Sequence, residues 1–569
     1  MNDYRPANPL VVQSDSTVLV EVASPRYPAV RDQLARFAEL EKSPEHVHSY
    51  RITPLSLWNA AASGMLAQAV IACLAEFGKF ELPENIRREI VELMSRYGRL
   101  KLLADDGQLL LVADDATLIA EILHQKRVQP YLGPALDRFR IAVASEQRGA
   151  LKQALIKIGH PVEDLAGYVE GEHFEIALRE QTLAGQLRFN LRDYQIDAIE
   201  VFHAGGDRRG GSGVIVLPCG AGKTVVGLGA MAALDTNTLI LTPSTVAARQ
   251  WIDEIIDKTS VPASAVGEYT GQSKQVRPIT VSTYQTLTYR SRKGAAMPHM
   301  QLFSERDWGL VIYDEVHLLP APVFRITADL QARRRLGLTA TLVREDGRAD
   351  EVFSLIGPKK YDVPWKDLEL QGWIATADCT EIRVPMPDGL RMRHAVAEER
   401  EKHAIAATSP AKLDVLAHLL AAHADDTVLI IGQYLEQLDA IASRFDLPLV
   451  TGRTGVAERE RRFAALRSGE ISRLVVSKVA NFSIDLPDAN VAIQVSGAFG
   501  SRQEEAQRLG RILRPKSDGR LAHFYSIVSR DSSDQTFAAK RQMFLTEQGY
   551  AYRILYAHEL LEQDSVGDE

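Results

Sequence analysis

The sequence is poor in cysteine. Among 569 residues it has three, Cys73, Cys219 and Cys379, which lie far apart and form no Cys-x-x-Cys pair or cluster with histidine. Neither a disulfide framework nor a structural zinc site is therefore indicated. The chain also lacks an apolar run of about 18 residues, the length that a membrane-spanning helix needs, and its N-terminus lacks the basic and apolar segments of a secretion signal. These absences predict a soluble, cytoplasmic protein with no membrane partner.

Positive charge is not in excess. Lysine and arginine number 66 against 74 aspartate and glutamate residues, and the formal net charge is −8. Binding to nucleic acid would have to come from local basic patches, because the field of the whole chain does not attract phosphate. The chain is also too long for one hydrophobic core, and at about 150 residues per domain it predicts three to four domains.

The first part of the chain mixes strands and helices. Alternating apolar residues over 9–22 predict a hairpin, and an amphipathic helix starts near Pro83. Two apolar runs around Asp105-Asp106-Gly107 predict a second hairpin, so that helix and hairpin together have the outline of a winged helix. We expect an N-terminal domain over 1–130 and a small α+β domain over 131–185.

From about Leu191 the pattern changes to short buried strands that alternate with helical segments. It runs over 186–365 and is repeated over 366–569. This alternation is typical of a parallel sheet with crossover helices. The predicted fold class is therefore α/β, with two tandem parallel-sheet domains and an α+β N-terminal region. A charged stretch at about 388–409 predicts an exposed helical insertion.

The segment LPCGAGKT, Leu217–Thr224, carries the clearest chemistry. A buried strand runs into 220–222, where missing side chains let backbone N–H groups surround a phosphate, and Lys223 opens a helix whose positive end favours anions. Lys223 would reach the outer phosphates of a nucleotide, and Thr224 would bind Mg²⁺. Leu217 stands where the strict pattern has glycine, which favours a helicase-like protein. A glycine-rich turn without a ligand is the alternative, which the flanking strand and helix disfavour.

A second motif, GLVIYDEVH, follows about 90 residues downstream. Its apolar strand delivers Asp314 and Glu315 at its end. Phosphate chemistry needs one carboxylate to hold the metal and another to orient and deprotonate the attacking water. An Asp-Glu pair in a solvated turn is the alternative, which the preceding buried strand disfavours.

The third motif, EEAQRLGRILRPK, places Gln507, Arg511 and Arg514 at helical spacing. A basic helix face is most often only solvent-exposed, and in isolation that reading would prevail. This helix closes the second α/β domain, however, so its arginines could reach a phosphate bound by the first domain. Such a role explains why two domains are needed.

Together these motifs resemble the superfamily 2 DNA helicases related to XPB, most closely the bacterial members. LRDYQ, LPCGAGKT, TPSTVAARQW, STYQTL, DEVH, GLTATLVRED, TGRT, SIDLP and QRLGRILR occur in the order of the family. The resemblance implies two RecA-like domains, a short thumb-like insertion at about 388–409, and ATP and Mg²⁺ as cofactors. It also implies that 131–185 is similar to the family's damage-recognition domain. Ala480-Asn481-Phe482 departs from the Gly-Asp expected before SIDLP.

The resemblance implies a role for each site residue. The catalytic residues would be Lys223, Asp314, Glu315, Gln507, Arg511 and Arg514. The nucleotide would be bound by Arg192, Gln195, Pro218, Cys219, Gly220, Ala221, Gly222, Lys223, Thr224 and Asp485, with Thr224 and Asp314 on Mg²⁺. Residues that bind DNA or couple it to ATP would be Thr242, Pro243, Thr283, Tyr284, His317, Thr339, Ala340, Thr341, Arg344, Glu345, Asp346, Thr451 and Gly452. Turn and packing roles for Pro243 and Tyr284 stay open.

The charged triplet Arg344, Glu345 and Asp346 distinguishes XPB-like proteins, where it is associated with strand separation. Opening a base-pair step costs about 1.4 kcal/mol, and stacking a base on an aromatic ring returns about 1–3 kcal/mol. A small polar wedge beside a translocating strand is therefore energetically adequate. An intramolecular salt-bridge cluster is the alternative.

The expected function is an ATP-dependent 3′ to 5′ DNA helicase with a role in DNA repair. It would act as a monomer on single strands and on forked or tailed duplexes, at the nucleoid of a prokaryotic cell, with a nuclease partner. One alternative is a duplex translocase that does not separate strands. Another is an ATP-gated DNA-binding scaffold that recruits a nuclease.

Overall fold

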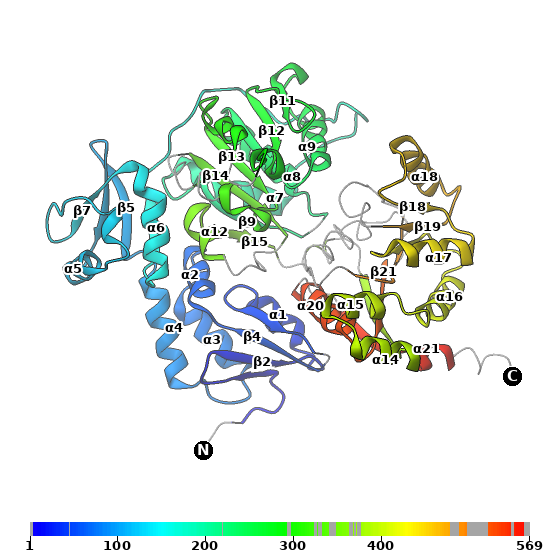
Figure 1. Ribbon diagram of the computed structural model, residues 1–569. Helices are drawn as coiled ribbons and strands as arrows, with labels where there is room; N and C mark the ends of the chain where they lie inside the picture. The colour runs from blue at the N-terminus through cyan, green and yellow to red at the C-terminus, as the bar shows by residue number, and fades with distance from the viewer. Residues whose placement is uncertain are drawn as a thin grey trace.

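A computed structural model describes residues 4–44, 46–218, 220–292, 297–323, 327, 333–340, 349–363, 368, 371, 377–477, 489–497, 522–547 and 551–562. Within them, two four-stranded sheets lie in the N-terminal part of the chain, and two seven-stranded sheets follow. Figure 1 shows the N-terminal elements beside the first large sheet and the second large sheet at the other side of the molecule.

The first small sheet is antiparallel, in the order β1-β2-β4-β3. Its strands are β1 (Leu10–Val12), β2 (Thr17–Glu21), β3 (Glu39–Lys42) and β4 (Val47–Arg51), and its helices are α1 (Tyr27–Leu34), α2 (Pro54–Ala62), α3 (Ala67–Phe77) and α4 (Glu84–Arg96). The hairpin predicted over 9–22 is confirmed as β1 and β2. The amphipathic helix predicted near Pro83 is α4, which buries Ile86, Ile90 and Leu93 on one face.

The second small sheet has the order β7-β6-β5-β8. Its strands are β5 (Leu100–Asp105), β6 (Gln108–Ala113), β7 (Arg140–Val143) and β8 (Val162–Leu165), with α5 (Ala116–His124) and α6 (Arg148–Lys157). Asp106 and Gly107 both have positive φ, as a tight hairpin turn requires. We refer to residues 100–165 as the small domain.

The arrangement of this sheet corrects the expected boundary at residue 130 and the winged-helix outline. Strand β6 pairs with β7 and strand β5 pairs with β8, so one sheet contains strands from both sides of that boundary. The hairpin thus belongs to a different sheet from the one that packs with α4. The local pattern of helix and hairpin does not specify which distant strand takes each free edge.

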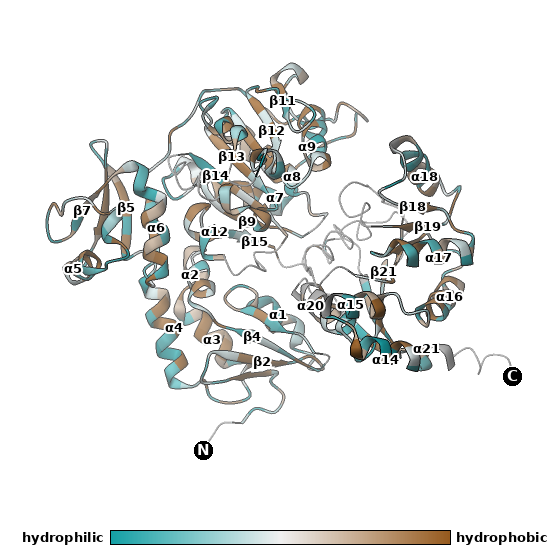
Figure 2. Cartoon of the chain, in the orientation of Figure 1, coloured by the Kyte–Doolittle hydropathy of each residue, from teal (hydrophilic) through white to brown (hydrophobic). Residues whose placement is uncertain are grey.

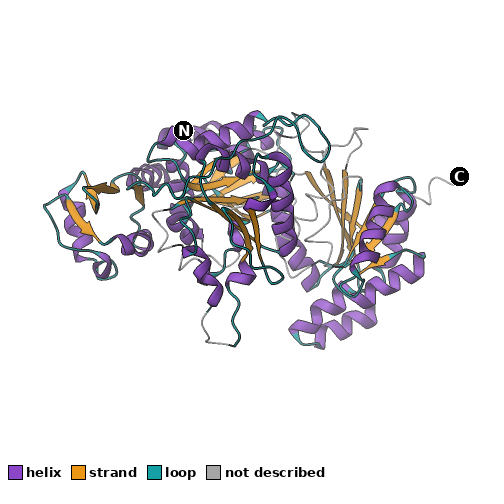
Figure 3. Ribbon diagram, turned by 90° about the horizontal axis from the view of Figure 1, so that it is seen from above, coloured by secondary structure: helices purple, strands orange, loops and turns teal. Residues whose placement is uncertain are grey.

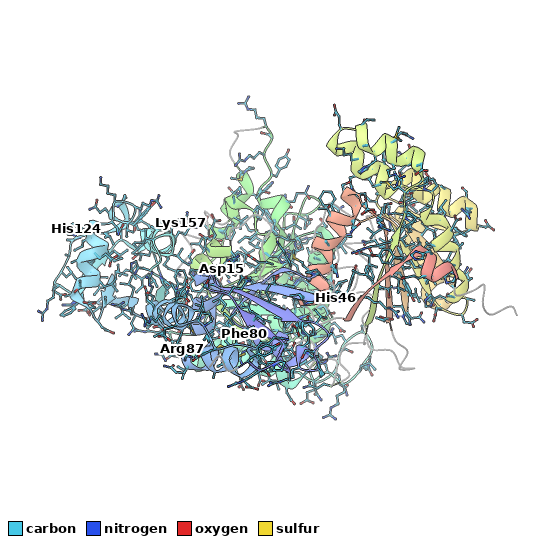
Figure 4. All side chains as sticks on the ribbon, turned by 90° about the horizontal axis from the view of Figure 1, so that it is seen from below. Asp15, His46, Phe80, Arg87, His124 and Lys157 are labelled. Atoms are coloured by element: carbon cyan, nitrogen blue, oxygen red, sulfur yellow. The ribbon has the colours of Figure 1, made fainter. Side chains whose placement is uncertain are left out.

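Figure 4, seen from below, places Asp15, Phe80 and Arg87 on the N-terminal domain and His124 and Lys157 on the small domain. His46, in the turn between β3 and β4, lies on the side of the N-terminal domain that faces the second large sheet.

The first α/β domain contains a parallel sheet in the order β11-β12-β10-β13-β14-β9-β15. Its strands are β9 (Ser212–Val216), β10 (Thr238–Thr242), β11 (Val266–Tyr269), β12 (Ile279–Thr283), β13 (Leu310–Asp314), β14 (Arg334–Thr339) and β15 (Lys359–Asp362). Its helices include α7 (Asp193–His203), α8 (Lys223–Leu234), α9 (Thr245–Lys258), α10 (Tyr284–Leu287) and α12 (Ala349–Leu355). The central strands are buried along their whole length, because helices cover both faces.

The second α/β domain repeats this architecture, in the order β18-β19-β17-β20-β21-β16-β22. Its strands are β16 (Ala377–Val384), β17 (Val428–Ile431), β18 (Leu449–Val450), β19 (Arg473–Val476), β20 (Val491–Gln494), β21 (Ala522–Ser529) and β22 (Ala551–Tyr556). Its helices include α16 (Lys412–Ala422), α17 (Leu435–Phe445), α18 (Val456–Ser468), α20 (Ser533–Glu547) and α21 (Ala557–Glu562). The predicted tandem α/β domains are confirmed, and Figure 3 shows strands with helices on both sides in each.

A helical insertion lies at the predicted place, between β16 and α16. It consists of α14 (Asp388–Val396) and α15 (Glu399–Ala407). Helix α14 buries none of its residues, and Met392 and Val396 are strongly exposed. Figure 2 shows the contrast between these helices and the hydrophobic strands inside both sheets.

The N-terminal domain contacts both α/β domains. The backbone N–H of Lys359 on β15 donates to the Asn59 side chain at 2.9 Å, and Met543 on α20 packs against the N-terminal core. In the part of the chain that the structure describes, no single helix is long and apolar enough to cross a membrane, although α2 and α3 pass that test of length and composition when joined across a bend of 117°.

Candidate active site

The P-loop predicted at Leu217–Thr224 connects β9 to α8. Gly220 and Gly222 have φ of +85° and +80°, a left-handed backbone that favours glycine. A Cβ atom added at Gly222 would lie 2.6 Å from Nε2 of Gln195, so a larger residue would displace that side chain. The loop leads directly into α8 at Lys223, so the backbone N–H groups and positive end of this helix add to those of the loop. This arrangement suits the phosphates of a nucleotide.

The start of α7 is bound to the P-loop. The Tyr194 hydroxyl donates to the Ala221 carbonyl at 2.7 Å, and Nε2 of Gln195 donates to the same oxygen at 3.0 Å. The backbone N–H of Arg192 donates to Oε1 of Gln195, and its guanidinium donates to the Tyr194 hydroxyl, both at 3.0 Å. Arg192 and Gln195, predicted to contact adenine, thus lie beside the P-loop. Tyr194 is an additional member of this site, and its place between the two predicted residues is the signal that could have found it.

The predicted acidic pair lies at the end of β13. Nζ of Lys223 lies 3.4 Å from Oε1 of Glu315, so two predicted catalytic residues meet. Oδ2 of Asp314 accepts a hydrogen bond from the Trp251 indole at 3.0 Å, and the Tyr284 hydroxyl donates to the Asp314 carbonyl at 2.8 Å. Glu315 has a φ of +49°, a strained conformation of the kind that functional sites retain.

Burial dominates the electrostatics of this pair. It raises the pKa of Asp314 to about 6, with the neighbouring Glu315 carboxylate as the second cause. Burial also acts to raise the pKa of Glu315, but the Lys223 ammonium and His317 outweigh it, and this pKa lies below its usual range. Two adjacent buried carboxylates suit a divalent cation, and the Asp314 carboxylate with the Thr224 hydroxyl supplies the oxygen ligands that Mg²⁺ prefers. The residues present therefore fit the predicted Mg²⁺.

The residues predicted to couple ATP to DNA form a chain of contacts. Nδ1 of His317 lies 2.7 Å from the Thr339 hydroxyl and 3.6 Å from Oε2 of Glu315. The backbone N–H of Leu217 donates to the Thr339 carbonyl at 2.9 Å. Ala340 follows directly and is buried. The end of β14 is therefore in contact with the P-loop on one side and with the acidic pair on the other.

Three side chains predicted to bear on the nucleic-acid backbone are buried. The Thr242 hydroxyl donates to the carbonyls of Ser244 and Ser282, both at 3.1 Å. The Thr283 hydroxyl accepts from the N–H of Thr286 and caps α10. Tyr284 is 4% exposed, with its hydroxyl bound at Asp314. These side chains satisfy polar groups where strands end, so any contact from them to DNA would involve the backbone.

Other residues predicted to bind DNA lie nearer the surface or outside the described part of the chain. Pro243 is half-buried and Gly452 is exposed. Thr451 and Thr454 form a tight turn in which the N–H of Thr451 donates to the Thr454 hydroxyl at 2.9 Å. The following predicted residues lie outside the described residues: Cys219, Thr341, Arg344, Glu345, Asp346, Asp485, Gln507, Arg511 and Arg514.

Two features of the site region are not evident from the motifs. Trp251 supports Asp314, and the absence of a side chain at Gly227 makes room for its ring, since a Cβ atom there would lie 2.4 Å from it. The spacing of tryptophan in TPSTVAARQW gives no direct signal for this contact, because it depends on how α9 packs on the sheet.

The other feature is a buried cluster of charges between the small domain and β14. The Asp164 carboxylate accepts from Arg148 at 2.7 Å and from Lys152 at 2.9 Å. The guanidinium groups of Arg148 and Arg335 each lie 5.7 Å from the ring centre of Tyr168. Arg335 belongs to β14, the strand that ends at Thr339, so this cluster connects the small domain to the strand that carries residues predicted to couple ATP to DNA.

Family models match three parts of the chain. The model described as ERCC3/RAD25/XPB C-terminal helicase matches residues 368–567. The model of the type III restriction enzyme res subunit matches 188–344, and a helicase conserved C-terminal domain matches 10–137.

Similar proteins extend over nearly the whole chain. The chain is 56% identical over 553 residues to the DNA 3′-5′ helicase XPB of Kineococcus radiotolerans, covering 97% of each protein. It is 54% identical to the DNA 3′-5′ helicase XPB of Mycobacterium tuberculosis, over 97% of this chain and 98% of the relative. It is 34% identical to a protein of Antonospora locustae named general transcription and DNA repair factor IIH helicase/translocase subunit XPB, over 97% and 82%.

Solved structures agree in fold. The ATP-dependent type ISP restriction-modification enzyme LlaBIII, bound to DNA, matches with a TM-score of 0.50 and 13% identity, covering 67% of this chain and 32% of that chain. At this identity the likeness concerns the fold alone.

Proposed function

The chain belongs to the XPB family of DNA 3′-5′ helicases, and from this premise we propose that it couples ATP hydrolysis at the Lys223 loop to the separation of DNA strands with 3′ to 5′ polarity. The observation that carries this proposal is the meeting of the Lys223 ammonium with the Glu315 carboxylate, 3.4 Å apart, at the edge of a RecA-like sheet. The hydrogen bond from Trp251 to Asp314 supports it, since an oriented carboxylate is what a metal ligand needs.

The roles follow from the positions of the side chains. Backbone N–H groups at Gly220–Gly222 bind phosphate, and Lys223 balances the charge of the outer phosphates. Thr224 and Asp314 hold Mg²⁺, which when bound neutralises phosphate charge in the transition state. Transfer of the Lys223 ammonium from Glu315 to phosphate leaves the Glu315 carboxylate available to orient a water molecule and accept its proton.

The contacts of His317 provide a route from hydrolysis to DNA. A change of charge at Glu315 alters its interaction with the His317 ring, which also contacts the Thr339 hydroxyl. Thr339 ends β14, and Arg344, Glu345 and Asp346 follow in the sequence after four further residues. We assign strand separation to this triplet, and adenine contact to Arg192 and Gln195.

The second RecA-like domain completes the site in this proposal. Gln507, Arg511 and Arg514 would face the phosphates from that domain, and Asp485 would lie near the ribose. An arginine supplied across a domain boundary stabilises the charge of the transition state, and this increases turnover by a factor on the order of a thousand or more. The second domain has a parallel sheet like that of the first. This supports the proposal, because such a sheet can present residues to a nucleotide that the two domains share.

Strand displacement tests the proposal. The substrates are duplexes with a 3′ tail or a 5′ tail, and ATP turnover is measured in parallel with single-stranded DNA, duplex DNA and RNA. ATP-dependent release from the 3′-tailed duplex supports a helicase. The name helicase/translocase carried by one relative favours duplex translocation as the second candidate; stimulation of ATPase by duplex without strand release would identify it.

The proposed cellular role concerns DNA as the substrate. We propose that the chain acts as a monomer on chromosomal DNA at the nucleoid during repair, where opened strands become accessible to a nuclease partner. Names of relatives that refer to DNA repair support this role. Loss of damage tolerance in cells that carry Glu315→Gln would support it, whereas full tolerance would favour an ATP-gated scaffold.

A further inference from the structure

The edge of the first helicase sheet that carries the coupling residues also has an exposed aromatic ring. Strands β11 and β12 are parallel neighbours, with Tyr269 in register with Ser282. The loops that follow them therefore leave the sheet at the same edge as the loops after β9 and β13. Figure 1 shows β11, β12 and α9 together at one end of the sheet. These loops therefore lie at the same edge of the sheet as the nucleotide site but toward its β11 end, with β10 between β12 and β13.

Tyr289 lies in the loop after β12 and is 57% exposed. Its ring centre is 6.2 Å from that of His299, and the planes are inclined by 44°. The His299 ring in turn packs edge-on against the buried Tyr269, at 5.6 Å, and Nδ1 of His299 lies 3.0 Å from the Tyr269 hydroxyl. A buried tyrosine and a histidine thus support the exposed ring from below, which holds it in place at little further entropic cost on binding.

Positive charge lies near this ring. Three exposed cations belong to the loops at this edge, Lys274 between β11 and β12, and Arg290 and Arg292 directly after Tyr289. The nearby carboxylates are Glu268 and Glu305; burial raises the pKa of Tyr269, and Glu305 acts in the same direction. Glu268 is already engaged by the Thr270 hydroxyl at 2.6 Å and faces Arg249 at 3.9 Å. The local excess of positive charge contrasts with the net charge of −8 for the whole chain, so it is a property of this surface.

An exposed aromatic ring among cations has a defined ligand chemistry. Cations attract the phosphates of a nucleic-acid backbone, and a flat ring stacks on a base whatever its identity. An apolar peptide would not use the cations, and an acidic peptide would leave the ring exposed. The combination therefore fits a single strand of nucleic acid with at least one base turned toward the protein.

We propose that a base of the bound DNA strand stacks on Tyr289, while Lys274 and Arg290 bind the neighbouring phosphates. This inference rests on the proposed DNA helicase function and extends it. The side chains of Thr242, Thr283 and Tyr284 are buried. Contacts to the DNA backbone at this edge, which do not depend on base sequence, are therefore made by the protein main chain. Tyr289 adds one contact to a base, which fixes the strand at a single nucleotide position.

Abasic nucleotides test this contact directly. The measurement is equilibrium binding of the full chain to a series of single-stranded oligonucleotides. Each oligonucleotide has one abasic nucleotide, at a different position along the sequence. A duplex block at the 3′ end fixes the position at which the protein binds. The wild type should lose affinity by about 5- to 150-fold at one position, the range expected for one base stack. Tyr289→Ala should bind the intact oligonucleotide more weakly by the same factor and show no further loss at that position. Tyr289→Phe should keep the wild-type pattern.

Tyr4→Ala is the matched control. Tyr4 is 54% exposed and stacks on Phe80 in the N-terminal domain, away from this edge. It should leave the abasic pattern of the wild type unchanged. The inference is overturned if Tyr289→Ala binds the intact oligonucleotide as tightly as the wild type, or if its abasic penalty persists at the same position. A wild type that shows the abasic position but releases no strand would keep the stacking contact and reject the helicase function.

Discussion

Nζ of Lys223 lies 3.4 Å from Oε1 of Glu315, although 92 positions separate the two residues along the chain. The parallel sheet makes this contact possible, because β9 and β13 both end at the same edge and only β14 lies between them. The ammonium and the carboxylate therefore balance each other's charge in a buried place where either alone would be costly.

Lys223→Ala should abolish ATP turnover, with a loss on the order of a thousandfold or more. The substitution removes the cation that faces the phosphates and also leaves Glu315 buried without its partner. Phosphate release measured with saturating DNA tests this expectation. Lys258→Ala, which removes a lysine paired with Glu254 in the same domain, should leave turnover nearly unchanged. Near-normal turnover in Lys223→Ala would overturn the nucleotide assignment.

Trp251→Phe should raise the Mg²⁺ concentration needed for half-maximal ATPase by about 10- to 100-fold, the usual effect of losing a partner that orients a metal ligand. Phenylalanine keeps an apolar ring at the position but has no N–H to donate to Asp314. A Mg²⁺ titration of turnover is the measurement.

Trp308→Phe is the control for Trp251→Phe. The Trp308 indole is also buried in this domain, but it donates to the Leu302 carbonyl, outside the site. An equal rise in the Mg²⁺ requirement for both variants would show that the effect of Trp251 is one of general stability.

Replacing Arg344, Glu345 and Asp346 together by Ala should reduce strand displacement more than DNA-stimulated ATPase. A wedge acts on the base pairs that open, whereas the ATPase site depends on residues outside the triplet. The ratio of strands released to ATP hydrolysed is the quantity to compare with the wild type. Equal losses in both activities would instead favour a structural salt-bridge cluster.

Asp164→Asn should lower the free energy of unfolding in the first thermal transition by about 3–5 kcal/mol, because it leaves Arg148 and Lys152 buried without their carboxylate. Burial alone would raise the pKa of Asp164, but Lys152 and Arg148 outweigh it and hold this pKa well below its usual range. The unfolded chain therefore takes up the proton first as the pH falls, so the stabilisation is complete above about pH 4 and is lost progressively as the pH falls further, toward the pKa of the folded state.

Calorimetry of the full chain at pH 7 and at pH 3.5 checks whether stability falls with pH in this direction. The wild type should lose stability over that interval, and Asp164→Asn should lose less of it. Asp137→Asn, at an exposed pair with Arg140 in the same small domain, should change the transition little at either pH. A transition in Asp164→Asn equal to that of the wild type at pH 7 would show that the buried cluster adds no stability.

Local patterns in the sequence were sufficient for the two large sheets and for the nucleotide site. Apolar strands alternate with helices, and the P-loop and the acidic pair each depend on a strand end followed by a specific turn, which a short window contains. The glycine positions also follow from local geometry, since Gly222 needs a positive φ.

Contacts between distant segments were not predictable in this way. On one edge β5 pairs with β8, which begins 57 positions after β5 ends. No local sequence pattern identifies that partner. The burial of Thr242 and Tyr284 depends on how neighbouring strands and loops pack, and a threonine at a strand end is compatible with either a surface or a core position. For the same reason the exposed Tyr289 could not be distinguished from a packing residue before its surroundings were seen.

The most direct test of the account is strand release from 3′-tailed and 5′-tailed duplexes by the wild type and by Glu315→Gln. Glutamine keeps the size of the side chain but cannot accept the proton of an attacking water molecule. The account predicts ATP-dependent release by the wild type from the 3′-tailed duplex only, and no release by Glu315→Gln from either. Equal release by the two proteins, or release by the wild type only from the 5′-tailed duplex, would contradict it.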